Sequence, residues 1–366
     1  MSVVATGTIE AASGWRLVWQ VLHLDLRDPF VIARSSHGAG RWVTTMVVEV
    51  DHPGHPGHVG LGEGYPDPYY GETPATMAAV LPALLDQVDG RVLSSDAAMA
   101  RAGLAASTDA FDEVIRGHGA ARCALDIALH DLAGRLTGLP VHRLVDLPAR
   151  IPPTDFTLGI DAPEVVAERA RRASAFPALK IKVGGPDDLR TLRAVREVYG
   201  GPIRVDANTG WDPEDAERLV PELVRLGVEL IEQPFPARRI DQLARLQARS
   251  PLPIVADESA VAIEDLEGLV GAVDGINVKL AKCGGIEPAR RMLARARELG
   301  FRTFLGCMEE TSVGIAGSAA VASLAEWIDL DGCLLLANDP FEGLELDPDH
   351  RWVLSDRPGL GVDRRP

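Results

Sequence analysis

Residues 179–234 read LKIKVGGPDDLRTLRAVREVYGGPIRVDANTGWDPEDAERLVPELVRLGVELIEQP, and this stretch decides the fold. It contains three short apolar runs, Leu179–Val183, Ile203–Ala207 and Leu230–Gln233, separated by charged segments such as Pro213–Leu226. The apolar runs are typical of buried strands, and the charged segments are typical of amphipathic helices. Strands and helices that alternate at a spacing of roughly 25 residues predict βαβ units and a parallel sheet.

The same alternation extends from about residue 150 to about residue 330, with Glu287–Leu299 as another helical segment. Eight strand candidates predict a TIM-type barrel. A doubly wound sheet is the alternative, but no glycine-rich G-x-G-x-x-G segment follows a strand to support dinucleotide binding. Besides the three runs above, the strand candidates are Phe156–Gly159, Ile254–Asp257, Gly275–Leu280, Thr303–Gly306 and Trp327–Leu330.

The first 120 residues have a different pattern. Apolar and polar residues alternate along Trp42–Val50, which predicts an antiparallel strand, and a Pro- and Gly-rich turn follows. Ala-rich segments at about residues 73–88 and 120–137 predict helices, so the front of the chain is predicted to be α+β. The turn holds three histidines, for which solvated side chains are favoured over a metal site: His52, His55 and His58.

Composition excludes several classes of partner. The chain has 366 residues and a formal net charge of −16 at pH 7, which argues against a surface for nucleic acid or anionic membranes. No apolar run approaches the ~18 residues of a membrane span, and Met1–Gly7 lacks the pattern of a signal peptide, so we expect a cytoplasmic protein. No two of the four cysteines have C-x-x-C spacing, which favours reduced thiols over a zinc site or disulfides: Cys123, Cys283, Cys307 and Cys333.

Acidic residues stand at the ends of three successive strand candidates: Asp206, Glu232 and Asp257. In a barrel the carboxyl ends of all strands open onto one mouth, where active sites lie. Three carboxylates that converge there repel one another unless a cation neutralises them. Mg2+ suits such a site because it takes few carboxylates and keeps positions for water or substrate. A single aspartate at a strand end is more often a helix cap or a turn former.

Lysines stand at the ends of the flanking strands. Lys180 and Lys182 share one face of their strand, because side chains alternate with a period of two. Lys279 lies in the strand candidate after the one that ends in Asp257. A lone lysine is more often solvated, but five successive strands that carry ionisable residues inside apolar runs predict a functional site.

These residues closely resemble the enolase superfamily, in its muconate lactonizing enzyme subgroup, over nearly the whole chain. The K-x-K motif of the subgroup matches Lys180-Ile181-Lys182, and residues 121–132 and 358–362 are also similar. The resemblance implies metal ligands, an opposite lysine and two residues that support the ligands: Asp206, Glu232 and Asp257; Lys279; Asn208 and Glu258.

The resemblance implies an α/β fold in which an α+β capping domain precedes a modified TIM barrel, (β/α)7β. We expect the capping domain at residues 1–135, the barrel at residues 136–337, and a C-terminal segment at residues 338–366 that returns to the capping domain.

The resemblance also implies a chemistry. Proton loss next to a carboxylate leaves an enediolate, whose charge Mg2+ stabilises. We expect Lys182 to be the base on one face, Lys180 its electrostatic neighbour, and Lys279 the acid or base on the opposite face. A lysine base must be neutral, so its pKa should be lowered towards ~7–8 by nearby positive charge and burial.

The last strand candidate bears on the substrate. Asp329 and Asp331 share one face and resemble the D-x-D motif with which dipeptide epimerases bind the substrate's α-ammonium group. A turn with solvated aspartates is the alternative. The resemblance also places Thr157 and Cys307 in contact with substrate.

A capping loop at about residues 29–42 is implied to read the second residue of the dipeptide. Arg34, His37 and Arg41 are the cationic candidates there for a side-chain carboxylate. A solvated loop is the open alternative for each of them.

We therefore predict a Mg2+-dependent dipeptide epimerase, an isomerase that removes and returns the α-proton of the C-terminal residue of an L,L-dipeptide. N-acylamino acid racemases, o-succinylbenzoate synthases and cycloisomerases of the same subgroup are the alternatives, and the pair Asp329 and Asp331 disfavours them. A catalytically inactive ligand-binding relative is the non-enzyme alternative, although no lysine or metal ligand is lost. The resemblance implies a homo-oligomer, but the sequence fixes neither the number of subunits nor the dipeptide.

Overall fold

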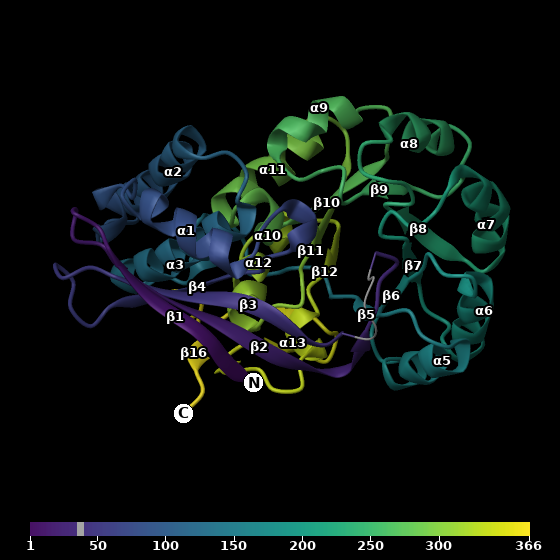
Figure 1. Cartoon of the computed structure of the whole chain (residues 1–366), viewed down its shortest axis with the longest axis horizontal. Helices are drawn as coiled ribbons and strands as arrows, with labels where there is room; N and C mark the ends of the chain where they lie inside the picture. The colour runs from purple at the N-terminus through teal and green to yellow at the C-terminus, as the bar shows by residue number, and fades with distance from the viewer. Residues whose placement is uncertain (35–39) are drawn as a thin grey trace.

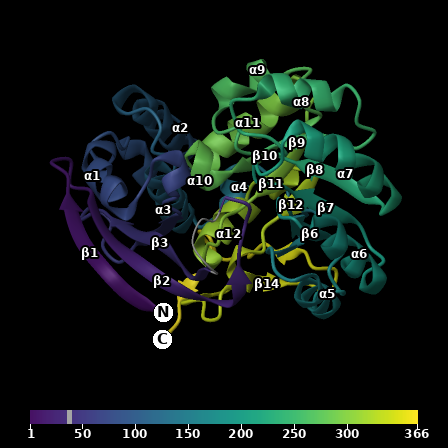
Figure 2. The same cartoon turned by 45° about the vertical axis from the view of Figure 1, so that its right-hand side comes forward.

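The computed structural model describes residues 1–34 and 40–366. Its N-terminal part is a four-stranded antiparallel sheet in the order β1-β2-β3-β4, with helices packed on it (Figure 1). Its C-terminal part is a barrel of parallel strands with helices around it (Figures 1 and 2). The N-terminal elements are β1 (Ser2–Glu10), β2 (Arg16–Phe30), β3 (Gly40–Asp51), β4 (Val59–Gly64), α1 (Pro74–Leu85), α2 (Ala97–Val114) and α3 (Gly119–Thr137).

Strand β3 shows why the alternating pattern becomes a strand here. Met46 and Val48 pack in a core with helices α1, α2 and α3. Val47, which points to the opposite face, packs in the core that contains the barrel. One face of the sheet therefore packs on the helices and the other faces the core that contains the barrel, so the middle of β3 is apolar on both faces.

The eight predicted barrel strands are confirmed. They form one parallel sheet in sequential order, and a bridge between Thr154 and Ile328 joins its first and last strands. A doubly wound sheet would need a change of strand order, so that alternative is wrong. The strands are β5 (Phe156–Leu158), β6 (Leu179–Lys182), β7 (Ile203–Asp206), β8 (Val228–Glu232), β9 (Ile254–Ala256), β10 (Gly275–Lys279), β11 (Arg302–Gly306) and β12 (Trp327–Asp329).

Helix α7 (Pro213–Arg225) illustrates how one barrel unit is specified. Asp212 caps its N-terminus by accepting a hydrogen bond from Asp215 N, and Pro213 occupies the first turn. Leu219 and Leu223 lie on its buried face. The other helices of this part are α4 (Val141–Leu144), α5 (Pro163–Arg172), α6 (Asp188–Val198), α8 (Ile240–Gln247), α9 (Leu266–Leu269), α10 (Leu280–Cys283), α11 (Ile286–Glu298), α12 (Ser312–Ala319) and α13 (Gly332–Leu335).

Across residues 1–34 and 40–366, no helix has the length and apolar character needed to cross a membrane.

The C-terminal segment runs back to the N-terminal part, and both views place the two termini near each other (Figures 1 and 2). Leu360 N donates to Asp131 Oδ1 of α3 at 2.7 Å. Arg364 donates to Gln20 on β2 and to Glu49 on β3. The segment contains β13 (Phe341–Glu342), β14 (Glu345–Leu346), β15 (Trp352–Val353) and β16 (Asp363–Arg364). The domain boundaries after residues 135 and 337 stay predictions.

Glu63 of β4 links the sheet to the barrel. Its buried carboxylate accepts hydrogen bonds from Thr311 N, Thr311 Oγ1 and Gly314 N, at the start of α12. Thr45 Oγ1 donates to it at 2.8 Å from the neighbouring strand. A side chain of the N-terminal part thus satisfies the free N–H groups of a barrel helix, close to the strand end that leads to Cys307.

Replacing Glu63 with glutamine is expected to lower the free energy of unfolding by about 1–3 kcal/mol, because the amide NH2 faces donors and a buried N–H loses its acceptor. Urea unfolding followed by circular dichroism measures this change. Glu49→Gln is the matched control, since Glu49 is exposed and its ion pair with Arg364 contributes at most about 1 kcal/mol. An equal loss of unfolding free energy in the two variants would contradict the role of Glu63 in joining the sheet to the barrel.

Candidate active site

The predicted metal-ligand, lysine and substrate-contact residues meet at the carboxyl ends of the barrel strands. A cavity of about 690 Å³ opens there between the barrel and the N-terminal sheet. Its walls include Lys180, Lys182 and Lys279 from the barrel, and Tyr65 and Tyr70 from the segment after β4. This is the arrangement expected for a TIM-type barrel, in which residues far apart in sequence converge on one mouth.

Three carboxylates, which we call the carboxylate triad, lie at the base of this region. They belong to Asp206, Glu232 and Asp257, each at most 1% exposed, and their ligand oxygens lie within 4.8 Å of one another. Nearby, Asn208 Oδ1 and Glu258 Oε2 are buried and accept no hydrogen bond from the described part of the chain. Buried oxygens of like charge without enough donors fit a hard divalent cation such as Mg2+.

The three predicted lysines contact the carboxylate triad from two sides. On β6, Lys182 Nζ donates to Asp206 Oδ2 at 2.7 Å, and Lys180 Nζ lies 2.9 Å from Glu232 Oε2. On β10, Lys279 Nζ lies 3.0 Å from Asp257 Oδ2. Strands β7, β8 and β9 separate β6 from β10, so Lys182 and Lys279 approach the triad from opposite sides.

Carboxylates raise the pKa values of two of the lysines. Burial lowers the pKa of Lys180, but Asp329, Glu232 and Asp206 outweigh burial and raise it well above its usual value. Lys279 is raised in the same way, chiefly by Asp257. With protein groups alone, the lowering expected for a lysine base is therefore not found at Lys279, because a carboxylate rather than a cation lies beside it. The raised pKa of Lys180 agrees with its expected role as a charged neighbour. A divalent cation on the triad would compete for the same negative charge.

The carboxylates of the triad differ among themselves. Burial and the charges of Asp206 and Asp257 raise the pKa of Glu232 to about 8. Burial would also raise the pKa of Asp206 and Asp257, but the lysines hold both below their usual range. Burial and repulsion therefore favour the protonated form of Glu232, whereas the lysines favour the ionised forms of Asp206 and Asp257.

Asp329 and Asp331 are buried in the same cavity, so the solvated-turn alternative is wrong. Thr157 connects the pair: its Oγ1 donates to Asp329 Oδ1 at 2.8 Å and its N–H donates to Asp331 Oδ2 at 2.6 Å. Asp329 Oδ2 lies 3.0 Å from Lys180 Nζ. Cys307, also predicted, lines the cavity beside them. The structure thus brings all four predicted substrate-contact residues together.

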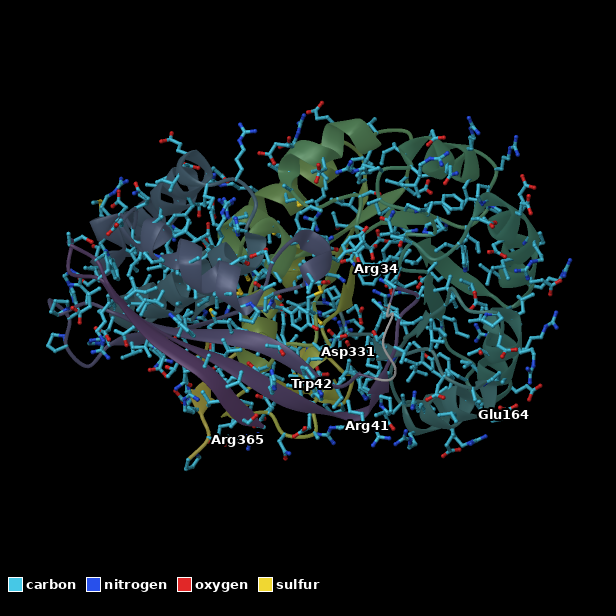
Figure 3. The ribbon with its side chains drawn as sticks, in the orientation of Figure 1. Arg34, Arg41, Trp42, Glu164, Asp331 and Arg365 are labelled. Carbon is cyan, nitrogen blue, oxygen red and sulfur yellow. The ribbon has the colours of Figure 1, made fainter. Side chains whose placement is uncertain are left out.

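Two cationic candidates of the capping loop, Arg34 and Arg41, lie apart from each other. Arg34 lines the cavity, but its Nη2 donates to Glu258 Oε1 at 2.9 Å and its guanidinium stacks over the Tyr69 ring. Arg41 is exposed and lies toward the end of the β2–β3 ribbon, whereas Arg34 and Asp331 lie between the sheet and the barrel (Figure 3). His37 falls outside the described residues.

Sequence reasoning missed three side chains that hold the triad. Asn277 Nδ2 donates to Glu232 Oε1 at 2.9 Å, and Gln233 Oε1 accepts from Asp257 N at 2.9 Å. Lys282 Nζ lies 2.5 Å from Asp257 Oδ1. The sequence does contain an indication of Lys282, because lysine is rare in this chain. Only four of the 37 Lys and Arg residues are lysines, and the other three are predicted site residues: Lys180, Lys182, Lys279 and Lys282.

The histidine turn carries no comparable cluster. His52, His55 and His58 lie between β3 and β4, and His52 packs edge-on against Trp15. Within residues 1–34 and 40–366, the carboxylate triad is the one group of His, Cys, Asp or Glu side chains close enough to hold a metal ion. His52 and His55 are half-buried and His58 is exposed.

Two family profiles match the chain. One, described as mandelate racemase / muconate lactonizing enzyme, N-terminal domain, matches residues 18–146. The other, described as enolase C-terminal domain-like, matches residues 164–366. The two matches correspond to the sheet-and-helix part and to the barrel with its C-terminal segment.

Several relatives are similar over almost their whole length. An L-Ala-D/L-Glu epimerase of Bacteroides thetaiotaomicron is 37% identical over 93% of this chain and 85% of its own. A dipeptide epimerase of Enterococcus faecalis, solved with Mg and L-Leu-L-Tyr, is 30% identical with a TM-score of 0.85, covering 95% of this chain and 99% of its own. The enzyme of Methylococcus capsulatus, solved with Mg and L-Arg-D-Lys, is 32% identical with a TM-score of 0.79, covering 99% of each chain.

Proposed function

The chain belongs to the mandelate racemase / muconate lactonizing enzyme family of the enolase superfamily, and from this premise we propose that it is a Mg2+-dependent dipeptide epimerase. It inverts the α-carbon of the C-terminal residue of an L,L-dipeptide. Its relatives are named for, or bind, dipeptides with acidic, aromatic and cationic side chains. Family membership therefore supports the reaction and leaves the preferred side chain to experiment.

One observation carries the proposal: two buried acidic side chains, those of Asp329 and Asp331, line the same cavity as the three lysines. Asp329 Oδ2 is 3.0 Å from Lys180 Nζ, which in turn is 2.9 Å from Glu232 Oε2 of the triad. A substrate in this cavity meets carboxylates for an ammonium group at one end and a cation site for a carboxylate at the other. A dipeptide zwitterion has both groups.

We assign the following roles. Mg2+ held by the carboxylate triad would supply the positive charge that stabilises the enediolate. Lys182 and Lys279, on opposite sides of the triad, take the α-proton from one face and return it to the other, which inverts the carbon. Lys180 keeps a positive charge next to Lys182. Asn208 and Glu258 support the triad from beside it, since Asn208 Nδ2 donates to Glu258 Oε1 at 3.1 Å.

The alternatives fit the cavity less well. A muconate or a succinylbenzoate precursor has no ammonium group, and the carboxylate of Asp329 would repel it. An inactive ligand-binding relative would be expected to have lost a lysine or a ligand, whereas Lys182, Lys279 and the complete triad are all present. Four free thiols support a cytoplasmic location, where thiols stay reduced, and family resemblance supports a homo-oligomer.

Proton exchange in D2O tests the proposal. The protein with Mg2+ is incubated with a library of L,L-dipeptides, and 1H NMR follows the α-proton of the C-terminal residue. Deuterium uptake together with appearance of the epimer is the expected result. Turnover of an N-acylamino acid or a succinylbenzoate precursor, with no dipeptide exchanged, would favour the alternative members of the subgroup.

Replacing Asp329 with asparagine is expected to raise KM for a free dipeptide by about 10- to 100-fold, because a charge-assisted contact worth ~1.5–3 kcal/mol is lost. KM for the same dipeptide acetylated at its amino group is expected to change much less. Steady-state kinetics on both substrates measure the difference. Glu164→Gln, on the outer surface of the barrel (Figure 3), is the control carboxylate. An equal rise in KM for both substrates would mean that Asp329 does not bind the ammonium group.

A further inference from the structure

A fourth lysine lies behind the carboxylate triad. Lys282 is in α10, three residues after Lys279, and its side chain is fully buried. Its Nζ lies 2.5 Å from Asp257 Oδ1 and donates to the main-chain carbonyls of Asp257, Ala260 and Asn277 at 2.7, 3.0 and 3.0 Å. It is absent from the described residues that line the cavity. Protein acceptors therefore saturate this ammonium group, and a substrate has no access to it.

Asp257 needs a partner because the strand ladder does not reach it. Strand β9 ends one residue before Asp257 and pairs with each neighbouring strand through only two residues. Asp206 and Glu232, in contrast, lie within β7 and β8 and are paired with each other in the ladder. Side chains hold Asp257 instead: Gln233 Oε1 accepts its N–H, and Lys282 binds its Oδ1.

Two lysines divide the oxygens of this carboxylate. Lys282 binds Oδ1 from behind, while Lys279 Nζ lies 3.0 Å from Oδ2 on the cavity side. If Lys282 were removed, Asp257 would be free to rotate and to pair with Lys279 through either oxygen. Such a pair would compete with a cation for the carboxylate.

Lysine usage supports a special requirement at this position. The chain has 37 Lys and Arg residues, and lysine occurs at only four positions, three of which are the proposed proton-transfer lysines and their neighbour. An ammonium group directs its donors around a single point, whereas the planar guanidinium of arginine presents a fixed fork. Three carbonyls and one carboxylate oxygen around Lys282 Nζ match the first geometry.

We propose that Lys282 is a positioning residue that holds Asp257 in the orientation from which it binds Mg2+. The inference rests on the proposed function, because it takes Asp257 to be a ligand of the cation. Lys282 does not touch the substrate in this account. It acts through Asp257 and by joining the segment that follows β9 to β10, because it binds carbonyls of both.

Titration of the purified protein with Mg2+ by isothermal calorimetry tests this role without reference to activity. Lys282→Met is expected to weaken Mg2+ binding by about 10- to 100-fold, the usual effect of losing a group that orients a ligand. The rise in Tm produced by Mg2+ is expected to shrink in parallel, because stabilisation follows the ratio of free ligand to Kd.

The matched control is Arg196→Met. Arg196 also donates to four main-chain carbonyls, those of Leu226, Tyr199, Gly201 and Gly227, but does so at the other end of the barrel. Its loss is expected to lower Tm and to leave the Mg2+ Kd unchanged. A general effect of destabilisation would weaken Mg2+ binding in both variants and would overturn the inference.

A folded Lys282→Met protein that binds Mg2+ with the parental Kd would also overturn it. If that variant does not fold, Lys282→Arg takes its place, since it keeps the charge and loses the geometry, and a parental Kd would then count against the role. Failure of the parent protein itself to bind Mg2+ would instead be a failure of the proposed function.

Discussion

Replacing Lys279 with methionine is expected to reduce epimerisation by about 10³-fold while the protein still exchanges the α-proton of one epimer. The reason is the placement of the two lysines on opposite sides of the triad, with Lys182 at 2.7 Å from Asp206 and Lys279 at 3.0 Å from Asp257. In the proposed reaction, each lysine serves one face of the α-carbon. With Lys279 absent, only the epimer that presents its proton to Lys182 remains reactive.

Deuterium uptake in D2O, measured separately on the L,L and L,D dipeptides, resolves the two half-reactions. Lys182→Met is the complementary variant, and it is expected to retain exchange of the opposite epimer. Mg2+ affinity in Lys279→Met is expected to stay the same or to rise, because an ammonium that competes for Asp257 has been removed. Loss of exchange with both epimers in both variants, with Mg2+ binding intact, would argue against a two-base reaction.

The strand ends of the barrel were predictable because they depend on local patterns. A short apolar run that stops at an ionisable residue indicates a strand that ends at the barrel mouth. Sequential strand order then places neighbouring strand ends together: Lys182 pairs with Asp206 in the β6–β7 ladder, and Asp206 pairs with Glu232 in the β7–β8 ladder. Strand order alone is therefore enough to predict that a lysine and two carboxylates of the site lie close together.

Partners from the N-terminal part were not predictable in this way. Glu63 satisfies Thr311, which lies 248 positions later, and Arg34 pairs with Glu258, which lies 224 positions later. No local sequence pattern predicts either contact, because both depend on how the N-terminal part packs against the barrel. The pair matters for function, because Arg34 was a candidate for binding a carboxylate of the substrate side chain. In the structure, its guanidinium is already paired with the carboxylate of Glu258.

The protonation of the site was the other gap. From the sequence, nearby positive charge was expected to lower the pKa of a lysine base, but Lys279 Nζ lies 3.0 Å from the carboxylate of Asp257, which raises its pKa. Strand positions show which groups meet and do not show which oxygen faces which ammonium. Since pKa shifts depend on those contacts, their direction had to come from the structure.

Binding of Mg2+ is expected to release about one proton per ion near neutral pH, and Glu232 is its source. Burial and the charges of Asp206 and Asp257 raise the pKa of Glu232 from 4.5 to about 8, although Lys180 opposes them. A ligand carboxylate must be ionised, so the cation displaces this proton. Apparent Mg2+ affinity should therefore rise with pH up to about 8 and level off above it.

Calorimetric titrations in buffers of different ionisation enthalpy count the released protons. In Glu232→Gln no proton is expected to be released, and Mg2+ affinity should fall by more than about 100-fold, since a ligand is lost rather than a group that orients one. Proton release that persists unchanged in this variant would assign the proton to another group.

The same pKa shift makes a prediction about stability without Mg2+. Because the pKa of Glu232 is higher in the folded protein than in the unfolded chain, the folded state binds more protons between pH 4.5 and about 8, and stability falls as pH rises through that window. Glutamine cannot ionise, so Glu232→Gln should remove this slope and should be more stable than the parent at pH 8 in the presence of a chelator. With saturating Mg2+ the order should reverse, because only the parent gains the binding energy of the cation. Urea unfolding of both proteins at pH 5 and pH 8, with and without Mg2+, measures their free energies of unfolding in these four conditions. A variant that is less stable than the parent in every condition would show that Glu232 contributes to folding rather than to cation binding.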